Sequence, residues 1–194
     1  LAQDNLKRRL AYSTIAQLSY VLRGVGLLVP DAQTGGLAHI GFHAVSKITL
    51  FFCAGAILVA AHKTRVSQLD GIGRRMPITR GAFTVGTLAM IGLPPTAGLV
   101  SKWFLEEGAA AGGHLGVHVV LLVSTMLNGA YFLPIVWRAF FRPAPDGQTG
   151  WKEAPWPCVV ALSATALLTI LLFFFPGVVL DLARGVVSAA GGVR

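Results

Sequence analysis

The chain alternates between long apolar segments and short polar connections. An α-helix rises about 1.5 Å per residue, so about 20 apolar residues cover the hydrocarbon core of a bilayer, which is about 30 Å thick. Segments that meet this requirement cover residues 10–29, 37–61, 81–111, 114–141 and 156–176. The pattern predicts an all-α integral membrane protein with about five transmembrane helices.

The third segment is interrupted by Gly-Leu-Pro-Pro-Thr-Ala-Gly at residues 92–98. Pro94 and Pro95 remove two adjacent amide donors that helix geometry would use. We therefore expect this helix to break near the middle of the membrane. The alternative is six crossings, with separate helices before and after the two prolines.

The basic residues distinguish between five and six crossings, because cytoplasmic loops of membrane proteins carry an excess of Lys and Arg. Five crossings place eleven basic residues on one face: Lys7, Arg8, Arg9, Lys63, Arg65, Arg74, Arg75, Arg80, Arg138, Arg142 and Lys152. The opposite face then receives only Arg184 and Arg194, whereas six crossings would divide the large group. We expect five crossings of a bacterial cytoplasmic (inner) membrane, with the N-terminus and the loops 63–80 and 138–155 in the cytoplasm.

Composition supports the membrane class. Hydrophobic residues make up 54% of the chain and charged residues 12%, which does not suit a soluble domain of this length. The net charge of +8 does not indicate nucleic-acid binding, because the basic residues lie in loops between apolar segments. Cys53 and Cys158 lie inside apolar segments without metal-ligand spacing. After the membrane part at 1–176, the tail at 177–194 suggests a short interfacial helix, which its glycines weaken.

Three ionisable residues recur at intervals of four in the second apolar segment: His39, His43 and Lys47. On a helix they form a column on one face, with a rise of about 6 Å between neighbours. An ionisable group at bilayer depth is a functional-site candidate by default. The column therefore predicts a proton relay. In a purely structural interpretation, His39 caps the start of the helix and His43 hydrogen-bonds a neighbouring helix.

A second polar group follows the two prolines. Lys102 precedes Glu106 and Glu107 by four and five residues, and broken membrane helices recur at ion sites in transporters. We expect Lys102 to exchange protons, with Glu106 or Glu107 as an ion-pair partner or at a water-filled exit. The structural alternative is a permanent pair between Lys102 and Glu106. Arg23 lies close enough to the non-cytoplasmic interface to extend its guanidinium toward it.

Four sequence features together resemble one family. They are Leu-Ala-Tyr-Ser-Thr-Ile-Ala-Gln-Leu-Ser-Tyr at 10–20, the histidine and lysine column, residues 71–77, and Gly-Leu-Pro-Pro-Thr-Ala-Gly-Leu-Val-Ser-Lys-Trp at 92–103. These features resemble the antiporter-like proton-translocating membrane subunits shared by respiratory complex I (NADH:quinone oxidoreductase) and the Mrp-type cation/proton antiporters. Residues 124–141 are most similar to the D subunit of the Mrp antiporters.

The resemblance implies a proton-conducting fold of two inverted five-helix repeats, of which this chain would supply the C-terminal part. Lys47 and His43 would lie on the central or connecting axis of the second half-channel, Lys102 would be the terminal lysine of the broken helix, and His39 would lie at the channel edge. The first repeat and the helix before Leu1 would be missing, so we expect that this segment does not pump by itself.

The predicted function is that of a proton-translocating subunit of a multisubunit Na⁺/H⁺ antiporter, with protons and sodium as the transported ions. Alternatives are a membrane subunit of NADH:quinone oxidoreductase or of a membrane-bound hydrogenase, and a truncated, non-conducting scaffold. We expect other membrane subunits and the lipid bilayer as partners, and no nucleic acid. The sequence has no glycine-rich nucleotide fingerprint and no cysteine cluster, so we expect no cofactor, metal or redox-catalytic residue.

Overall fold

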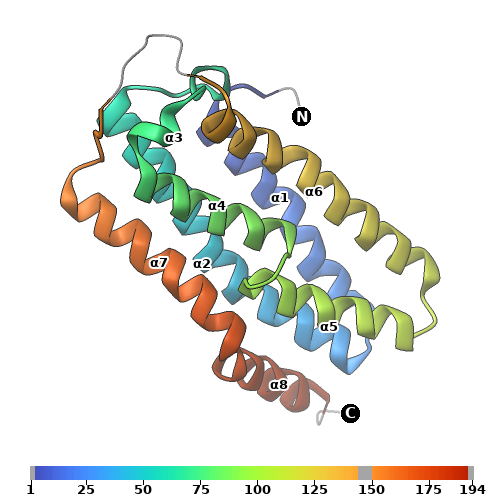
Figure 1. Cartoon of the computed structure of the whole chain (residues 1–194). Helices are drawn as coiled ribbons and strands as arrows, with labels where there is room; N and C mark the ends of the chain where they lie inside the picture. Colours follow the sequence, from blue (N-terminus) through green and yellow to red (C-terminus); the bar gives the residue numbers. More distant parts are fainter. Residues whose placement is uncertain (1–2, 144–149, 192–194) are drawn as a thin grey trace.

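The computed structural model describes residues 3–143 and 150–191, and Figure 1 shows a bundle of helices with the two chain ends at opposite ends of the molecule. The elements are α1 Leu6–Gly26, α2 Pro30–Ala61, the 3₁₀ turn η1 Val66–Gln68, α3 Ile72–Arg75, α4 Pro77–Ile91, α5 Ala97–Ala111, α6 Leu115–Phe141, α7 Trp156–Phe174 and α8 Gly177–Gly191. Within the described ranges there is no β-strand, only a single bridge between Asn5 and Arg65. The predicted all-α class is confirmed.

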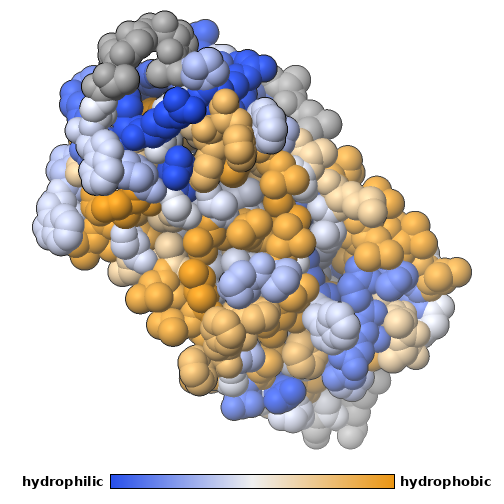
Figure 2. Space-filling model, in the orientation of Figure 1, coloured by the Kyte–Doolittle hydropathy of each residue, from blue (hydrophilic) through white to orange (hydrophobic). Residues whose placement is uncertain are grey.

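Three helices are each long and apolar enough to cross a membrane: α2, α6 and α7. Helix α1 packs against α2, and α4 and α5 lie end to end (Figure 1). Large apolar side chains cover much of the outer surface, which Figure 2 shows as extensive orange areas. Such a surface suits lipid better than water.

Helix α2 begins at Pro30, seven residues before the expected start. The prediction of a connecting loop at 30–36 was therefore wrong, and only residues 27–29 join α1 to α2. Pro30 occupies the first turn, where its missing amide costs nothing, and Asp31 lies beside the positive end of the helix dipole. Hydropathy alone missed this turn because it is polar.

Helix α2 is the central element of the bundle. It packs against α1, α4, α5, α7 and α8, and buried residues occur all around it. Small residues allow a close crossing with α1: a Cβ built on Gly24 would lie 2.7 Å from the Cα of Gly36. The central position of α2 brings its ionisable column within reach of α1 and α5.

The expected break between Gly92 and Thr96 is confirmed. Helix α4 ends at Ile91, Gly92 adopts a left-handed conformation with φ +90°, and α5 starts after the extended residue Thr96. Glycine adopts this conformation without the steric cost of a side chain. The break leaves carbonyl groups of the last turn of α4 without helical partners.

The N-terminus, the segment 62–76 and the C-terminal end of α6 gather at one end of the bundle. Arg138 Nε donates to Asp70 Oδ1 at 2.8 Å, and Arg142 Nη1 donates to Asp70 Oδ2 at 3.4 Å. The hydrogen bond from Arg138, and the charges of both arginines, hold the pKa of Asp70 below its usual range. These contacts join the connection after α2 to the end of α6.

The expected loop at 138–155 lies in part outside the described residues, which omit 144–149. Its described end folds back onto the same region. The amide of Lys152 donates to the carbonyl of Arg75 at 2.9 Å, and Glu153 accepts from the amide of Ile78 at 2.7 Å and the hydroxyl of Thr79 at 2.8 Å. Glu153 thus satisfies donors at the start of α4.

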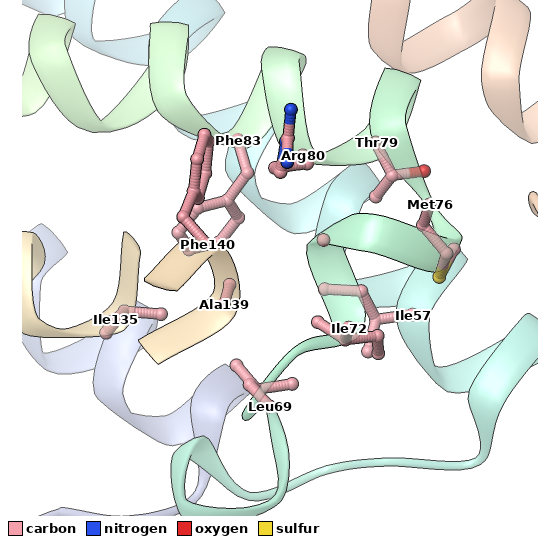
Figure 3. Close-up of a pocket in the computed structure, with 11 residues that line it drawn as sticks. Ile57, Leu69, Ile72, Met76, Thr79, Arg80, Phe83, Ile135, Ala139 and Phe140 are labelled. Atoms are coloured by element: carbon pink, nitrogen blue, oxygen red, sulfur yellow. The ribbon is translucent and has the colours of Figure 1, made fainter. Parts of the chain in front are cut away.

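A small hollow lies between α3, α4, α6 and the end of α2 (Figure 3). Its volume of about 20 Å³ is close to that of one water molecule, but its lining is almost entirely apolar. The guanidinium of Arg80 lies over the Phe140 ring, 4.3 Å from its centroid. A water needs two or more polar partners, so we interpret this hollow as a packing feature.

The tail forms a regular helix over its described part, although its glycines suggested a weak one. Leu180 and Ala183 pack against Ala38 and Phe42 of α2 and Ala97 of α5. Residues 192–194 lie outside the described part of the chain. An interfacial position for α8 remains a prediction.

The close approach of α5 to α4 gives the first test. A Cβ built on Gly98 would overlap the carbonyl oxygen of Ala89, so we expect Gly98→Ala to lower the free energy of unfolding by about 1–3 kcal/mol. The measurement is thermal unfolding of the purified protein in detergent. Gly116→Ala is the control, because a Cβ there meets nothing within 4 Å. Equal stability of the two variants would contradict the packing described here.

Candidate functional site

The predicted column on α2 consists of buried and half-buried groups. His39 is 3% exposed and Lys47 is 6% exposed, and His43 between them is half-buried. The imidazoles of His39 and His43 stack with their ring centroids 5.7 Å apart. The structure therefore brings the three side chains onto one face, as the four-residue spacing predicted.

Lys47 points across the α1–α2 crossing. Its Nζ donates to the hydroxyl of Ser13 on α1, and that hydroxyl donates to the carbonyl of Leu10 at 2.8 Å. No carboxylate pairs with Lys47 in residues 3–143 or 150–191. A buried cation with one neutral partner is costly to keep charged, because that partner replaces only part of the hydration that the charge has lost.

His39 forms two hydrogen bonds to other helices. Its Nε2 lies 3.0 Å from Gln17 Oε1, and its Nδ1 lies 2.8 Å from Ser101 Oγ. Because Gln17 Oε1 can only accept, the neutral ring carries its proton on Nε2, and Nδ1 accepts from Ser101. His39 therefore lies in the interior and joins α1, α2 and α5. The alternative that it caps a helix start was wrong, because α2 begins nine residues earlier.

His43 has no hydrogen-bond partner for either ring nitrogen within the described chain, although both atoms are buried. The proposed hydrogen bond from His43 to a neighbouring helix is thus not present there. His43 lines a groove of about 470 Å³ between α1 and α2, together with Lys47, His39 and Gln17. The groove is large enough for several waters, and its exposed lining is almost entirely apolar.

Lys102 occupies the break between α4 and α5. Its Nζ donates to the carbonyls of Met90 at 3.1 Å and Ile91 at 2.8 Å, and it lies 4.9 Å from the centroid of the Tyr20 ring. These carbonyls are among those left unpaired by the break, and they form the negative end of the α4 dipole. The break thus supplies the partners of the buried ammonium group.

Gln17 connects His39 to the surroundings of Lys102. It accepts from His39, and its Nε2 donates to the carbonyl of Met90 at 3.4 Å. The same carbonyl accepts from Lys102. From His39 to Lys102 the polar contacts are continuous, whereas one helical turn, about 6 Å of rise, separates His43 from Lys47.

The two expected acidic residues differ in their surroundings. Glu106 Oε2 lies 2.6 Å from Nδ1 of His118 on α6, and Glu107 is exposed. The structural alternative of a pair between Lys102 and Glu106 was wrong for the described residues, whose ion pairs join Glu106 to His118 instead. The position of His118 in an apolar segment gave no sign of this contact in the sequence.

Arg9 is a further buried cation that the sequence analysis assigned to a polar flank. It is 7% exposed, its Nη2 donates to the carbonyl of Tyr131 at 2.6 Å, and its guanidinium lies 4.5 Å from the centroid of the Tyr131 ring. Arg9, Ser13, Gln17 and Tyr20 are buried at helical spacing on one face of α1. This helical spacing was the signal in the sequence that Arg9 belongs to the buried face of α1. Arg23 is half-buried in the last turn of α1.

The fold and site define a helical membrane protein with buried cations at a broken helix. Residues 1–128 match the family model described as NADH:quinone oxidoreductase/Mrp antiporter, transmembrane. This chain belongs to that family, so the resemblance noted in the sequence is confirmed.

Curated relatives include NADH-quinone oxidoreductase subunit N of Desulforudis audaxviator, which is 39% identical over 193 residues. F(420)H(2) dehydrogenase subunit N of Methanosarcina mazei is 29% identical over 192 residues. Each alignment covers 94% of this chain, and the chain spans 37% and 39% of the length of the two relatives, respectively.

Solved structures of two kinds share the fold. The Mrp complex from Dietzia sp. DQ12-45-1b matches with a TM-score of 0.85 at 22% identity, over 96% of this chain and 43% of the matched chain. Respiratory complex I from Thermus thermophilus with bound aureothin matches with a TM-score of 0.68 at 29% identity, over 93% and 40%. At 22% identity, the Mrp match shows the fold alone.

The bond between Lys47 and Ser13 generates a test. Ser13→Ala removes the hydroxyl partner of a buried ammonium group, so we expect it to lower the free energy of unfolding by about 1–3 kcal/mol. Ser19→Ala is the matched control, because Ser19 lies on the same helix and, within the described part of the chain, its hydroxyl bonds only the carbonyl of Ala16, at 2.6 Å. Denaturant unfolding of the purified protein measures both. Equal losses would show that the contact with Lys47 does not contribute.

Proposed function

We propose that this chain serves in a proton-translocating membrane subunit of a complex I-type assembly. The observation that carries the proposal is the pair of buried lysines, Lys47 and Lys102, neither of which pairs with a carboxylate within the described residues. A lysine without a counter-ion in a low-dielectric site is poised to lose its proton. Family membership and the polar contacts between His39 and Lys102 support the same function.

The sequence comparisons favour a redox-driven assembly over an Mrp antiporter. The relatives at 39% and 29% identity are named as subunits of NADH-quinone oxidoreductase and of F(420)H(2) dehydrogenase, whereas the Mrp structure shares the fold at 22% identity. We therefore propose that electron transfer in partner subunits drives proton movement here. Exchange of sodium for protons, as expected from the likeness to the Mrp D subunit, is the second candidate.

In this proposal a proton moves between the two lysines across the bundle. His39 and His43 are placed to accept and release protons between them, and the groove beside His43 has room for water. Gln17 and Ser101 hold the ring of His39 in place. Deprotonation of one lysine raises the proton affinity of the next group, because it removes a nearby positive charge.

Proton flux into vesicles that contain the full assembled complex tests the proposal. We expect Lys47→Ala and Lys102→Ala each to reduce electron-transfer-driven acidification at least tenfold at equal protein levels, because each removes a protonatable group that no neighbour replaces. Lys63→Ala, at the end of the bundle, should leave the flux unchanged. Unchanged flux in both buried-lysine variants would support a non-conducting scaffold. Sodium-dependent flux without electron transfer would favour the antiporter.

We also propose that the end of the bundle with segments 62–76 and 150–155 faces the cytoplasm. Their mutual contacts support a common side, and the excess of basic residues there supports the cytoplasmic side.

Labelling in intact cells tests this orientation. In a background with Cys53→Ala and Cys158→Ala, we expect Leu28→Cys to react with a membrane-impermeant maleimide from outside. Lys63→Cys should react only after the membrane is permeabilised, because it lies at the opposite end. The reverse labelling pattern would contradict the proposed orientation.

A further inference from the structure

A hollow beside Lys102 opens toward the exterior between α5 and α6. Its volume is about 490 Å³, and its polar lining comes from Lys102, Glu106, Glu107, His118 and Thr125. Figure 2 shows a hydrophilic area over the adjoining ends of α5 and α6, within a surface that is mostly apolar. The buried lysine thus has a polar outlet on its own side of the bundle.

Exposure increases step by step along this hollow. Lys102 is 6% exposed, and the side chains of Glu106 and His118 are 22% and 35% exposed, respectively. Glu106 follows Lys102 by one helical turn on the same face of α5. His118 faces Glu106 from the first turns of α6, so the three groups form a series from the interior to the surface.

The contact between Glu106 and His118 is close. Oε2 of Glu106 lies 2.6 Å from Nδ1 of His118, neither atom is accessible to solvent, and the ring is not oriented for a hydrogen bond between them. Other charged or titratable groups near the pair are Lys102 and Glu107 on α5 and, at the N-cap of α6, His114. A carboxylate and an imidazole at this distance can exchange a proton once a small rotation of the ring directs its nitrogen at the oxygen.

We propose that Glu106 and His118 form the proton connection between Lys102 and water at this end of the bundle. This inference rests on the proposed function and adds His118 to the groups that carry the proton. Glu106 is the inner partner of the pair and His118 the outer one. Glu107, on the exposed side of the hollow, is not required.

Each proton step balances. The Lys102 ammonium passes a proton through a bridging water in the hollow to the Glu106 carboxylate, so an N–H bond breaks at Lys102 and an O–H bond forms at Glu106. The carboxylic acid passes its proton to Nδ1 of neutral His118, and the resulting imidazolium releases the proton on Nε2 to water. A ring flip then returns an unprotonated nitrogen to Glu106. The reverse sequence carries a proton inward.

Proton flux in vesicles with the assembled complex tests the inference. We expect His118→Gln and Glu106→Gln each to reduce flux at least fivefold, because both remove a group that accepts and releases protons. His114→Gln, which changes the other histidine at the start of α6, should retain wild-type flux. Assembly of each variant is checked from the amount of intact complex in the membrane.

Chemical rescue separates a proton carrier from a structural tie between α5 and α6. Added imidazole should restore flux to His118→Ala, because it can occupy the space of the missing ring, and it should not restore flux to Lys102→Ala. Wild-type flux in His118→Gln and Glu106→Gln, with flux lost in Lys102→Ala, would overturn this inference alone. Lost flux in His118→Ala without rescue by imidazole would also overturn it. Absence of flux in the wild-type complex would instead overturn the proposed function.

Discussion

The cost of burying an ammonium group at bilayer depth is the constraint on which the structure depends. Lys102 would lose several kcal/mol of hydration in an unbroken apolar bundle. The helix break offsets this loss, because α4 ends with carbonyls of Met90 and Ile91 that accept from its Nζ. The lysine in turn satisfies carbonyls that the break leaves without helical partners. The helix break therefore stabilises the buried Lys102, and Lys102 stabilises the helix break.

The second buried lysine, Lys47, has fewer partners than Lys102. Lys47 meets one hydroxyl, from Ser13, and faces a groove between α1 and α2. Lys102 meets two carbonyls and an aromatic ring. The two buried ammonium groups therefore differ in the number and kind of their partners. Gln17 and His39 lie between these two sites.

Much of the fold followed from the sequence, because hydropathy and proline reflect forces that act locally. The prolines Pro94 and Pro95 marked the break, and the spacing of His39, His43 and Lys47 gave their common face. The polar first turn of α2 was missed because it contains Asp31, which hydropathy treats as a loop residue although it favours a helix start.

The sequence alone did not predict which side chains meet between helices. Glu106 had an apparent partner one turn away in Lys102, yet the structure pairs it with His118 from another helix. Arg9 looked like a flanking charge, but packing against Tyr131 on α6 buries it. The Mrp-like interpretation of 124–141 relied on one helix, whereas the sequence relatives over nearly the whole chain include subunits of redox-driven complexes. The contacts of Glu106 and Arg9 depend on how the helices pack, which local sequence patterns do not determine.

The central claim is that protons pass between Lys47 and Lys102 by way of His43, His39 and Gln17. Water at His43 would bridge the gap to Lys47. Electron cryomicroscopy of the assembled complex, at a resolution that reveals ordered waters, tests it most directly. The account predicts water bonded to the ring nitrogens of His43 and continuing to Lys47, because neither buried nitrogen meets a protein partner in the described chain. A dry groove filled by apolar side chains around His43 would contradict it.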